Sequence, residues 1–244
     1  MSFKNNGIDD VVRVVIAFMK SALDTESAVL TGDKRVYRQN LLSGVKHPHA
    51  NHSLRQWLSL LDAVRYTMTE CFTHLNDLLE VVRDNVLELV MDCNGCRIIN
   101  MLFLEFSEQP HYVVGHVLET LLGDTDQLLL LCLHEYANYP IQLAVELDPE
   151  RIFRAVELHF CAVAPHKYGN YVATKCLKFA PRSWLPIFTD AFIKHKVALA
   201  VDPKYSRWVR TALINSLTAN GQASLVFKLD QSLLSHPDLL PKER

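Results

Sequence analysis

Four short segments of this chain combine a turn-forming stretch, a flat aromatic or Arg side chain, and an apolar helix. They are residues 94–100, 136–142, 168–174 and 205–211. If Cys96, Asn138, Asn170 and Arg207 are equivalent, successive segments lie 42, 32 and 37 residues apart. A recurring spacing of this size is typical of stacked helical repeats. Each repeat would then place three side chains at equivalent positions on one face of the helical array.

The elements that position these segments are expected to be helices. Residues 11–23 and 58–89 carry apolar side chains at three-to-four spacing, sustained alternation is absent, and the chain has eight glycines. In one unit, a helix over 149–164 precedes a break at 165–169 and a second helix over 170–179. The next unit repeats this order over residues 184–200, 203–206 and 207–217. The sequence therefore predicts an all-α, right-handed α-solenoid of stacked helical repeats.

The bulk composition suits a folded protein of one or two domains. The chain has 244 residues, of which 49% are hydrophobic and 21% charged. Residues 1–6 lead into a charged helix instead of a signal peptide, and most of the six cysteines lie in apolar runs. We therefore expect a reducing compartment without disulfides. Because no uncharged apolar run reaches 18 residues, we expect no membrane-spanning helix.

The net charge of −2 conceals a strong asymmetry. Residues 151–210 contain eleven Lys or Arg and three acidic residues, whereas residues 1–150 contain 11 and 21. A basic region beside an acidic one suggests two different partners, one of them polyanionic. The same distribution also fits two solvated helix faces.

The repeated segments resemble the Pumilio/FBF (PUF) family of RNA-binding repeats over roughly residues 80–217. The motifs that carry the resemblance are Asn94-Gly95-Cys96-Arg97-Ile98-Ile99, Tyr136-Ala137-Asn138-Tyr139-Pro140-Ile141-Gln142 and Tyr168-Gly169-Asn170-Tyr171-Val172. In that family the second helix of each repeat lines a concave surface and reads one base. A weaker candidate repeat, residues 49–55, places Asn51 at 45 residues before Cys96.

The resemblance implies a role for three side chains in each second helix. Two residues four apart lie one turn apart on one helix face and can hydrogen-bond one base edge together. The residue after the first wedges between successive bases, so a flat side chain suits it. The edge-reading pairs would be Cys96/Asn100, Asn138/Gln142, Asn170/Thr174 and Arg207/Thr211. The stacking residues would be Arg97, Tyr139, Tyr171 and Trp208.

The resemblance also carries departures from the family pattern. Asn138 with Gln142 is the family's uracil-reading pair, whereas the other three pairs differ from the usual ones. Pro140 is acceptable only in the first helical turn, and it should displace Tyr139 from helical geometry. We expect the tyrosines before the helices in the core between repeats. They are Tyr136, Tyr168 and Tyr205.

Basic side chains in the same region would add phosphate attraction, which weakens with salt. They are Lys167, Lys175, Lys178, Lys204 and Arg210. Together with the stacking residues, they predict that the basic C-terminal half binds single-stranded RNA.

Metal binding and catalysis have little support in the sequence. Cys93 and Cys96 have metal-ligand spacing, but a structural zinc ion needs four ligands and no second close pair exists. The clustered His47, His49 and His52 are far away in sequence. We expect Cys93 in the core, Cys96 at the groove, and neither metal nor other cofactor. Phosphate-loop, zinc-protease and nucleophile-elbow motifs are absent, so we do not expect an enzyme. A nucleic-acid enzyme would require Asp190 or Asp202 in the basic groove.

These observations predict a divergent PUF-like module that controls translation or decay of messenger RNA, in the cytoplasm or alternatively the nucleus or nucleolus. Its acidic N-terminal half would dock a protein, and the chain would be a monomer or a hetero-complex subunit. The alternative is a protein-interaction scaffold, for RNA processing or ribosome assembly, that has lost base reading. The expected organisation is a weakly repetitive acidic helical part or cap over 1–79, repeats over 80–217, and a C-terminal cap and tail over 218–244.

Overall fold

The computed structural model describes residues 34–59, 69–105, 112–201 and 203–239. Within these ranges the chain forms helices joined by turns, with no strand. It divides into two compact units, Met1–Thr120 and Leu121–Arg244. The predicted all-α class is confirmed, and none of the described helices is long and apolar enough to cross a membrane. The expected helix over residues 11–23 lies outside the described residues.

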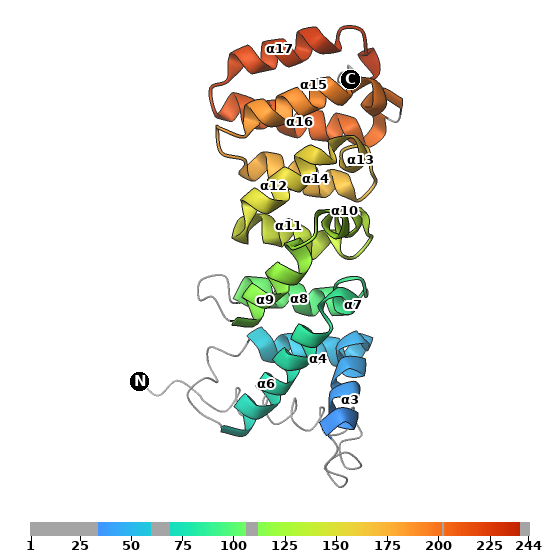
Figure 1. Cartoon of the computed structure of the whole chain (residues 1–244), viewed down its shortest axis with the longest axis vertical. Helices are drawn as coiled ribbons and strands as arrows, with labels where there is room; N and C mark the ends of the chain where they lie inside the picture. Colours follow the sequence, from blue (N-terminus) through green and yellow to red (C-terminus); the bar gives the residue numbers. More distant parts are fainter. Residues whose placement is uncertain (1–33, 60–68, 106–111, 202, 240–244) are drawn as a thin grey trace, which may run out of the picture. The chain divides into compact units, whose positions relative to one another are not determined.

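Six helices begin in the described part of unit 1 (Figure 1). Its helices are α3 (Lys34–Lys46), α4 (Pro48–Ser59), α6 (Thr69–Asp84), α7 (Val86–Val90), α8 (Gly95–Glu105) and α9 (Tyr112–Leu122). Helix α4 packs against α8, while α3 contacts both α4 and α6. Of residues 58–89, the described ones form the end of α4, helix α6 and the short α7, which follows a break at Asn85, and residues 60–68 lie outside the described part of the chain.

Unit 2 stacks its helices in chain order (Figure 1). They are α10 (Thr125–Leu133), α11 (Asn138–Leu147), α12 (Pro149–Leu158), α13 (Phe160–Val163), α14 (Gly169–Phe179), α15 (Leu185–Val201), α16 (Pro203–Ala219), α17 (Ala223–Leu233) and a final 3-10 turn, Pro237–Leu239. Helix α14 packs against α11 on one side and α16 on the other. Helix α12 likewise contacts α10 and α15. Two rows of helices therefore run through this unit, and α11, α14 and α16 are the second helices of its repeats.

An aromatic cluster joins the first helices of unit 2. Phe153 meets the ring of Trp184 at 5.4 Å and that of Phe188 at 5.8 Å, both edge to face. Phe160 lies 5.9 Å from Phe192. All four phenylalanines are fully buried. Such aromatic pairs contribute about 0.5–1.5 kcal/mol beyond their buried area, so this cluster holds α12, α13 and α15 together and leaves the second helices to face outward.

Two details of the expected unit are corrected by the structure. The helix expected over 149–164 is split at His159, where φ is −105° and α12 gives way to α13. The break expected at 203–206 is absent, since α16 runs without interruption from Pro203 to Ala219. Proline at the first position of a helix has its φ already set for helical geometry, so Pro203 begins a helix where the other repeats have a turn.

Gly95 and Gly169 are equivalent residues of α8 and α14. Each directly precedes the first residue of an edge-reading pair, Cys96 or Asn170, which we call the first reading position of its helix. A Cβ atom on Gly169 would lie 2.6 Å from the Val163 carbonyl oxygen, at the end of α13. A Cβ atom on Gly95 would lie 2.6 Å from the Leu89 carbonyl oxygen, in α7. Both neighbours are backbone atoms that cannot swing aside. The close approach of the short helix therefore requires glycine at each position.

Replacing Gly169 with alanine is expected to lower the free energy of unfolding by about 1–3 kcal/mol, because α13 must shift to relieve the clash. Gly115→Ala is the matched control. Gly115 lies inside α9 with no heavy atom within 4 Å of an added Cβ, so alanine should stabilise by about 0.5–1 kcal/mol through helix propensity. Urea titrations of both variants measure the difference. Equal behaviour of the two variants would contradict the packing argument.

Candidate nucleic-acid interface

The turn before each of four second helices is held by one side chain that accepts backbone N–H groups. His134 Nδ1 accepts from Tyr136 and Ala137, at 3.2 and 3.3 Å. His166 Nδ1 accepts from Tyr168 and Gly169, both at 3.3 Å. The carboxylate of Asp92 accepts from Asn94 at 2.9 Å and Gly95 at 2.7 Å, and His47 accepts from Ala50 at 3.4 Å. We call these residues the turn acceptors: His47, Asp92, His134 and His166.

Each turn acceptor stands four residues before the first reading position of its helix. In α11 and α14 that position is an asparagine whose side-chain amide is fully engaged. Asn138 Nδ2 donates to the carbonyl oxygens of His134 at 2.8 Å and Glu135 at 2.9 Å. Asn170 Nδ2 donates to those of His166 and Lys167 at the same distances. The turn is therefore fixed from both ends, by the acceptor ring and by the asparagine amide.

The four predicted stacking residues all lie on the surface. Tyr139 is 57% exposed, Tyr171 55% and Trp208 70%, and Arg97 is exposed as well. Tyr139, Tyr171 and Trp208 occupy equivalent positions on α11, α14 and α16, of which α14 contacts the other two. Three large aromatic rings thus stand in one row on unit 2. Exposed large apolar side chains that gather on one surface are typical of interaction sites, so this row is the candidate binding surface of unit 2.

Pro140 does not displace Tyr139. It lies within the first turn of α11, where the N–H that proline lacks would have no helical partner. Tyr139 N donates to the Tyr136 carbonyl oxygen at 3.2 Å, and Tyr171 N donates to Tyr168 at 3.1 Å. The matching bonds and exposures show the same local geometry in both repeats, so the expected displacement is wrong.

The edge-reading pairs differ in what they leave available for a base. Asn138 and Asn170 are only 1% and 5% exposed, and their amide hydrogens are already used. Gln142 Nε2 donates to Asn138 Oδ1 at 3.0 Å, so this pair is joined across one helical turn. Thr174 is half-buried. At both asparagines, the side-chain oxygen is the atom that keeps hydrogen-bonding capacity for a ligand.

The pair on α16 is built differently, because Pro203 stands where a turn acceptor would be. Arg207 is half-buried and its Nε donates to the Pro203 carbonyl oxygen at 3.2 Å. Thr211 is exposed and its hydroxyl donates to the Arg207 carbonyl oxygen at 2.9 Å. Helix α16 therefore presents Trp208 fully, but its two edge residues are partly engaged with their own backbone.

The two cysteines around the start of α8 lie opposite to expectation. Cys93 is exposed, whereas Cys96 is buried and its thiol donates to the Cys93 carbonyl oxygen at 3.5 Å. Burial raises the pKa of the Cys96 thiol to about 11, against the opposing influence of Arg97. The Cys96 thiol is therefore neutral at physiological pH. Among the described residues, no group of three His, Cys, Asp or Glu side chains is arranged to hold a metal ion. Asn100, its partner one turn on, is half-buried.

Two of the predicted phosphate contacts are occupied by acidic side chains. Arg210 is buried and forms an ion pair with Asp230 of α17 at 2.5 Å, so the expectation that it faces RNA is wrong. Lys175 Nζ lies 2.5 Å from Glu146 Oε1, which links α14 to α11. Arg210 holds the last helix in place, because its guanidinium is sequestered between α16 and α17.

Three other lysines lie near aromatic rings, two of them at helix starts and one at the end of α14. Lys167 Nζ is 4.4 Å from the Tyr168 ring centroid, and Lys204 Nζ is 4.9 Å from that of Tyr205. Lys178 Nζ lies 5.9 Å from the ring of Phe179. These cations lie over exposed or half-buried rings, where cation–π attraction is about 0.5–1 kcal/mol. Lys167, Lys178 and Lys204 are themselves exposed.

Tyr136, Tyr168 and Tyr205 are half-buried, so the expectation that they are core residues is wrong. Tyr168 spans neighbouring repeats, with its hydroxyl 3.5 Å from Glu135 Oε2. Its ring also meets the His166 ring edge to face, with centroids 5.7 Å apart. Tyr168 therefore buttresses the turn acceptor from outside the core.

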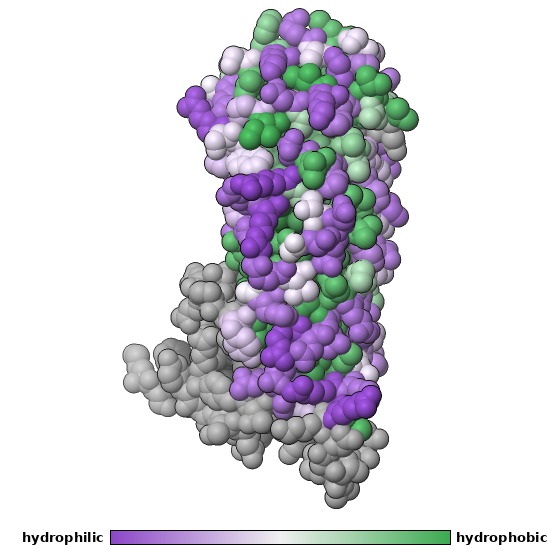
Figure 2. All heavy atoms as spheres, viewed as in Figure 1, coloured by the Kyte–Doolittle hydropathy of each residue, from purple (hydrophilic) through white to green (hydrophobic). Residues whose placement is uncertain are grey.

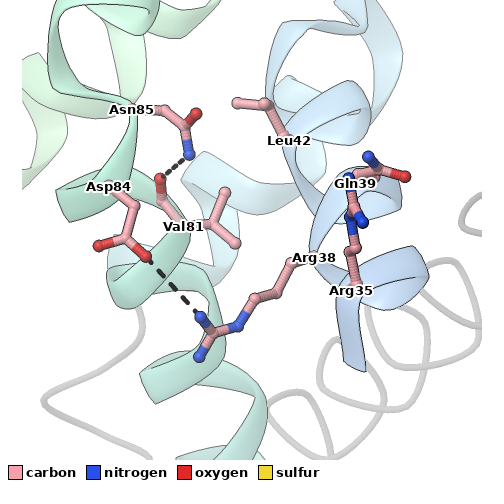
Figure 3. Close-up of a pocket in the computed structure, with 7 residues that line it drawn as sticks. All are labelled: Arg35, Arg38, Gln39, Leu42, Val81, Asp84 and Asn85. Carbon is pink, nitrogen blue, oxygen red and sulfur yellow. Dashed lines mark hydrogen bonds and ion pairs between the residues drawn. The ribbon is translucent and has the colours of Figure 1, made fainter. Parts of the chain in front are cut away.

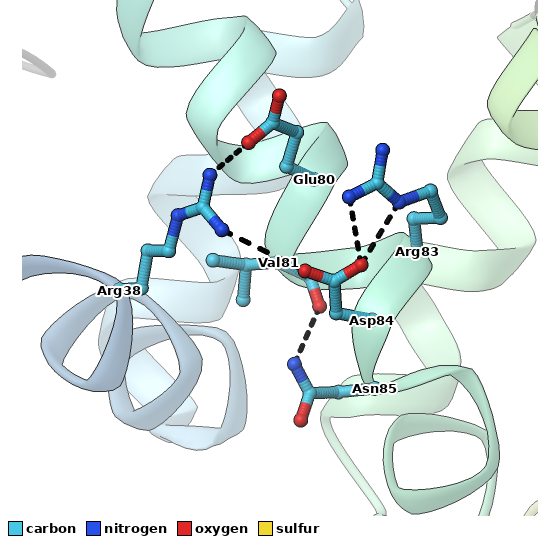
Figure 4. Close-up of polar contacts among 6 residues, drawn as sticks. All are labelled: Arg38, Glu80, Val81, Arg83, Asp84 and Asn85. Carbon is cyan, nitrogen blue, oxygen red and sulfur yellow. Dashed lines mark hydrogen bonds and ion pairs between the residues drawn. The ribbon is translucent and has the colours of Figure 1, made fainter. Parts of the chain in front are cut away.

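Unit 1 also has a pocket between α3 and α6 (Figure 3). It is lined by Arg35, Arg38, Gln39, Leu42, Val81, Asp84 and Asn85. Arg38 forms ion pairs with Glu80 and, at 3.7 Å, with Asp84, which also binds Arg83 at 2.8 Å (Figure 4). Acidic side chains balance these arginines, and the pocket lies on the first helices rather than on the row of second helices. It is therefore a poor site for a polyanion.

Sequence reasoning missed the turn acceptors. It considered His47 only as a possible metal ligand and gave no role to Asp92, His134 or His166. A signal was present, since a histidine stands four residues before Asn51, before Asn138 and before Asn170. Before Cys96 the equivalent residue is Asp92 instead of a histidine. It has the same function, because a carboxylate accepts N–H groups as a neutral imidazole does.

Comparisons with known proteins agree with the fold of this chain. The chain is 25% identical to a putative pumilio homolog 13 of Arabidopsis thaliana, in an alignment of 159 residues that covers 57% of this chain and 29% of that protein. Its fold matches the Puf4 RNA binding domain bound to an HO endonuclease RNA 3′ UTR recognition sequence, with a TM-score of 0.64, 18% identity, and coverage of 89% of this chain and 64% of that one.

A second structure, the Puf3 RNA binding domain bound to the Cox17 RNA 3′ UTR recognition sequence site A, gives a TM-score of 0.60 at 20% identity. It is matched over 82% of this chain and 55% of that domain. The chain thus covers less than two thirds of each of these relatives. No protein-family model matches the chain.

The turn acceptor of α14 gives the fold a pH dependence. Partial burial, and then the charge of Lys167, hold the pKa of His166 below its ordinary value of 6.5. A lowered pKa means that the unfolded chain binds the proton more readily, so stability is present above pH 6.5 and is lost as pH falls through the folded pKa. Protonation also removes the Nδ1 acceptor.

We expect the urea midpoint of the wild type to fall between pH 7.5 and pH 5, and the fall to be smaller in His166→Asn, whose side-chain oxygen still accepts. His116→Asn, on an exposed part of α9, should reproduce the wild-type change. An identical pH response in all three proteins would show that His166 is not involved.

Proposed function

We propose that this chain, a protein of the Pumilio/FBF (PUF) repeat type in sequence and fold, binds single-stranded RNA on the second helices of its repeats. The observation that carries the proposal is the row of exposed Tyr139, Tyr171 and Trp208 on the contacting helices of unit 2. Unpaired bases stack on such rings, and each stacked base contributes about 1–3 kcal/mol. Arg97, exposed at the equivalent place on α8, offers a guanidinium plane to a further base.

Electrostatic attraction has a smaller part in this binding than the basic composition indicates. Four of the eleven basic residues between 151 and 210 form ion pairs with acids that lie outside that range. The pairs are Arg151–Asp148, Arg154–Glu150, Lys175–Glu146 and Arg210–Asp230. Phosphate attraction then rests on side chains such as Lys167, Lys178, Arg182 and Lys204, which are exposed. We therefore expect a modest salt dependence, set by a few phosphate contacts.

The cellular role extends this proposal. The relatives are a pumilio homolog and RNA-binding domains bound to 3′ UTR sequences, which supports control of messenger RNA translation or decay in the cytoplasm. The acidic N-terminal half suits a protein partner, since it would repel a polyanion. The proposal assigns the chain no catalytic step and no cofactor.

A protein-interaction scaffold is the second candidate function. Apolar side chains away from the second-helix row reach the surface, and Leu130, Leu158, Phe227 and Leu234 are 63–69% exposed. Figure 2 shows apolar residues interspersed with polar ones over the face in view. Together with the engaged Asn138 and Asn170 amides, these side chains favour docking of a protein over reading of bases. Such a scaffold would keep the repeats and lose selective RNA affinity.

The discriminating variant is Tyr171→Ala combined with Trp208→Ala. Loss of two stacking rings should weaken binding of a labelled uridine-rich RNA by at least about tenfold, measured by fluorescence anisotropy at two salt concentrations. Phe227→Ala removes an equally exposed aromatic ring from α17 and should bind RNA like the wild type. The proposal fails if the double variant binds equally well, or if wild type prefers heparin of the same length.

Arg210→Met separates structural from electrostatic roles in the basic region. It breaks the ion pair with Asp230 and should lower the free energy of unfolding by about 1–2 kcal/mol, since Asp230 is partly solvated. RNA affinity per folded molecule should remain unchanged, because the guanidinium is buried. The exposed Lys178→Met is the comparison, with weaker RNA binding and unchanged stability. A loss of RNA affinity in Arg210→Met would place that side chain at the interface after all.

A further inference from the structure

The last α-helix of unit 2 exposes large apolar side chains on the side that faces away from the repeats. Helix α17 packs against α15 and α16 and buries Leu229 and Leu233 (Figure 1). At about 3.6 residues per turn, Phe227 and Leu234 lie roughly opposite these two, and they are 66% and 67% exposed. The end units of a stacked array normally have a polar outer face. Two large apolar side chains on such a face therefore indicate a contact that covers them.

The exposed residues along the middle of this side have the spacing of a helix-pairing seam. Successive members are separated by three, four and three positions, which is the a and d pattern of paired helices. All of them are exposed. Leu234 is the C-cap of α17, yet it keeps helical angles of φ −55° and ψ −31°, so it continues the line of the helix. We call these four residues the end seam: Ser224, Phe227, Gln231 and Leu234.

The charges beside the end seam are neutralised within unit 2. Of the exposed residues of α17, which the structure describes throughout, only Lys228 is charged. Its Nζ lies 2.7 Å from Asp190 Oδ1 of α15. At the opposite edge of α17, Asp230 forms an ion pair with Arg210 of α16 at 2.5 Å. A polyanion or a strongly charged peptide thus finds no complementary charge here, whereas a second surface of the same composition can approach without repulsion.

We propose that the end seam is a self-association surface, on which a second copy of this chain packs its own α17 in antiparallel orientation. A two-fold axis makes such a contact self-complementary, because residue i of one copy meets residue j of the other and j meets i. With the axis midway between Phe227 and Leu234, each phenylalanine packs on the leucine of the other copy. Gln231 then lies beside the axis, where its amide can donate to and accept from Gln231 of the second copy. A single polar residue in an apolar seam fixes the register of the pair.

This pairing is expected to be weak and reversible. Helix α17 has 11 residues and is therefore about 16 Å long, so the contact buries less than the roughly 1,600 Å² of a standard interface. We expect a dissociation constant on the order of 10 μM. The end seam lies on α17, whereas the row of stacking residues lies on α11, α14 and α16. The inference therefore does not depend on RNA binding.

Sedimentation velocity of the full chain, over protein concentrations from about 1 to about 200 μM, measures the association. The mass of the wild type should rise from that of one chain to that of two. Phe227→Arg and Leu234→Arg should each raise the dissociation constant at least about tenfold, because the two-fold axis places the desolvated charge in the contact twice. Leu130→Arg is the matched control, since Leu130 of α10 is 69% exposed, and it should associate like the wild type.

Two further variants test the antiparallel register. Phe227→Lys and Leu234→Glu should each be monomeric when alone over the same concentrations. Their equimolar mixture should form dimers with one copy of each, because the new lysine faces the new glutamate of the other copy. On the other side of the axis the unchanged leucine of the first variant meets the unchanged phenylalanine of the second.

A wild type that stays monomeric throughout, a dimer that Phe227→Arg leaves intact, or a mixture that stays monomeric overturns the inference. Equal loss of association in Leu130→Arg also overturns it, because the effect would then not be specific to the end seam. Thermal melts by circular dichroism establish that each variant is folded. RNA binding by Phe227→Arg, measured at nanomolar protein where the wild type is monomeric, should match the wild type. Failure of this inference and failure of the proposed function are therefore separate results.

Discussion

The arrangement of this surface depends on one hydrogen-bonding device, which recurs at the turn before four of the second helices: α4, α8, α11 and α14. A side-chain acceptor four residues ahead of the first reading position takes up backbone N–H groups that would otherwise lack partners at the helix start. Each such bond contributes about 1 kcal/mol net. More importantly, the bonds give the turn one conformation, so that the residue after each reading position emerges at the same angle. Tyr139 and Tyr171 have nearly equal exposure for this reason.

The asparagines at the first reading positions are equivalent in sequence but bind different partners. Asn138 and Asn170 bind the carbonyl oxygens behind them with the same pair of distances, so they reinforce the turn from inside the helix. Asn51 instead ties α4 to the turn before α8 through Asn94. The side-chain oxygen accepts from Gln142 in Asn138, whereas it has no donor in Asn51. The residue one turn further along differs between these helices: it is Gln142 in α11, Thr174 in α14 and Arg55 in α4.

Several charged side chains of unit 2 bind groups on neighbouring helices and are therefore not available to attract a polyanion. Lys175 of α14 forms an ion pair with Glu146 of α11, and Arg210 of α16 forms one with Asp230 of α17. Lys196 caps the carbonyl oxygen of Ser232 at 2.7 Å, and Lys228 pairs with Asp190 at 2.7 Å. Stacked repeats contact only their neighbours, so interfaces between adjacent units carry much of their stability. A basic composition in such a protein is therefore a poor measure of the charge available to a polyanion.

The sequence by itself determined the repeat, the helical class and the exposed aromatic row, because period and residue type are local properties that survive without knowledge of contacts. It could not determine which basic groups face outward. Arg210 and Lys167 look alike in sequence, and only packing against α17 sequesters the first. Nor could it decide that α16 starts at Pro203, that Cys96 is buried and Cys93 exposed, or that Tyr168 stays half-buried, since each depends on how closely a neighbouring helix approaches. The donors and acceptors left for a base were likewise decided by the folded structure. The side-chain amides of Asn51, Asn138 and Asn170 already donate to backbone carbonyl oxygens and are not available to a ligand.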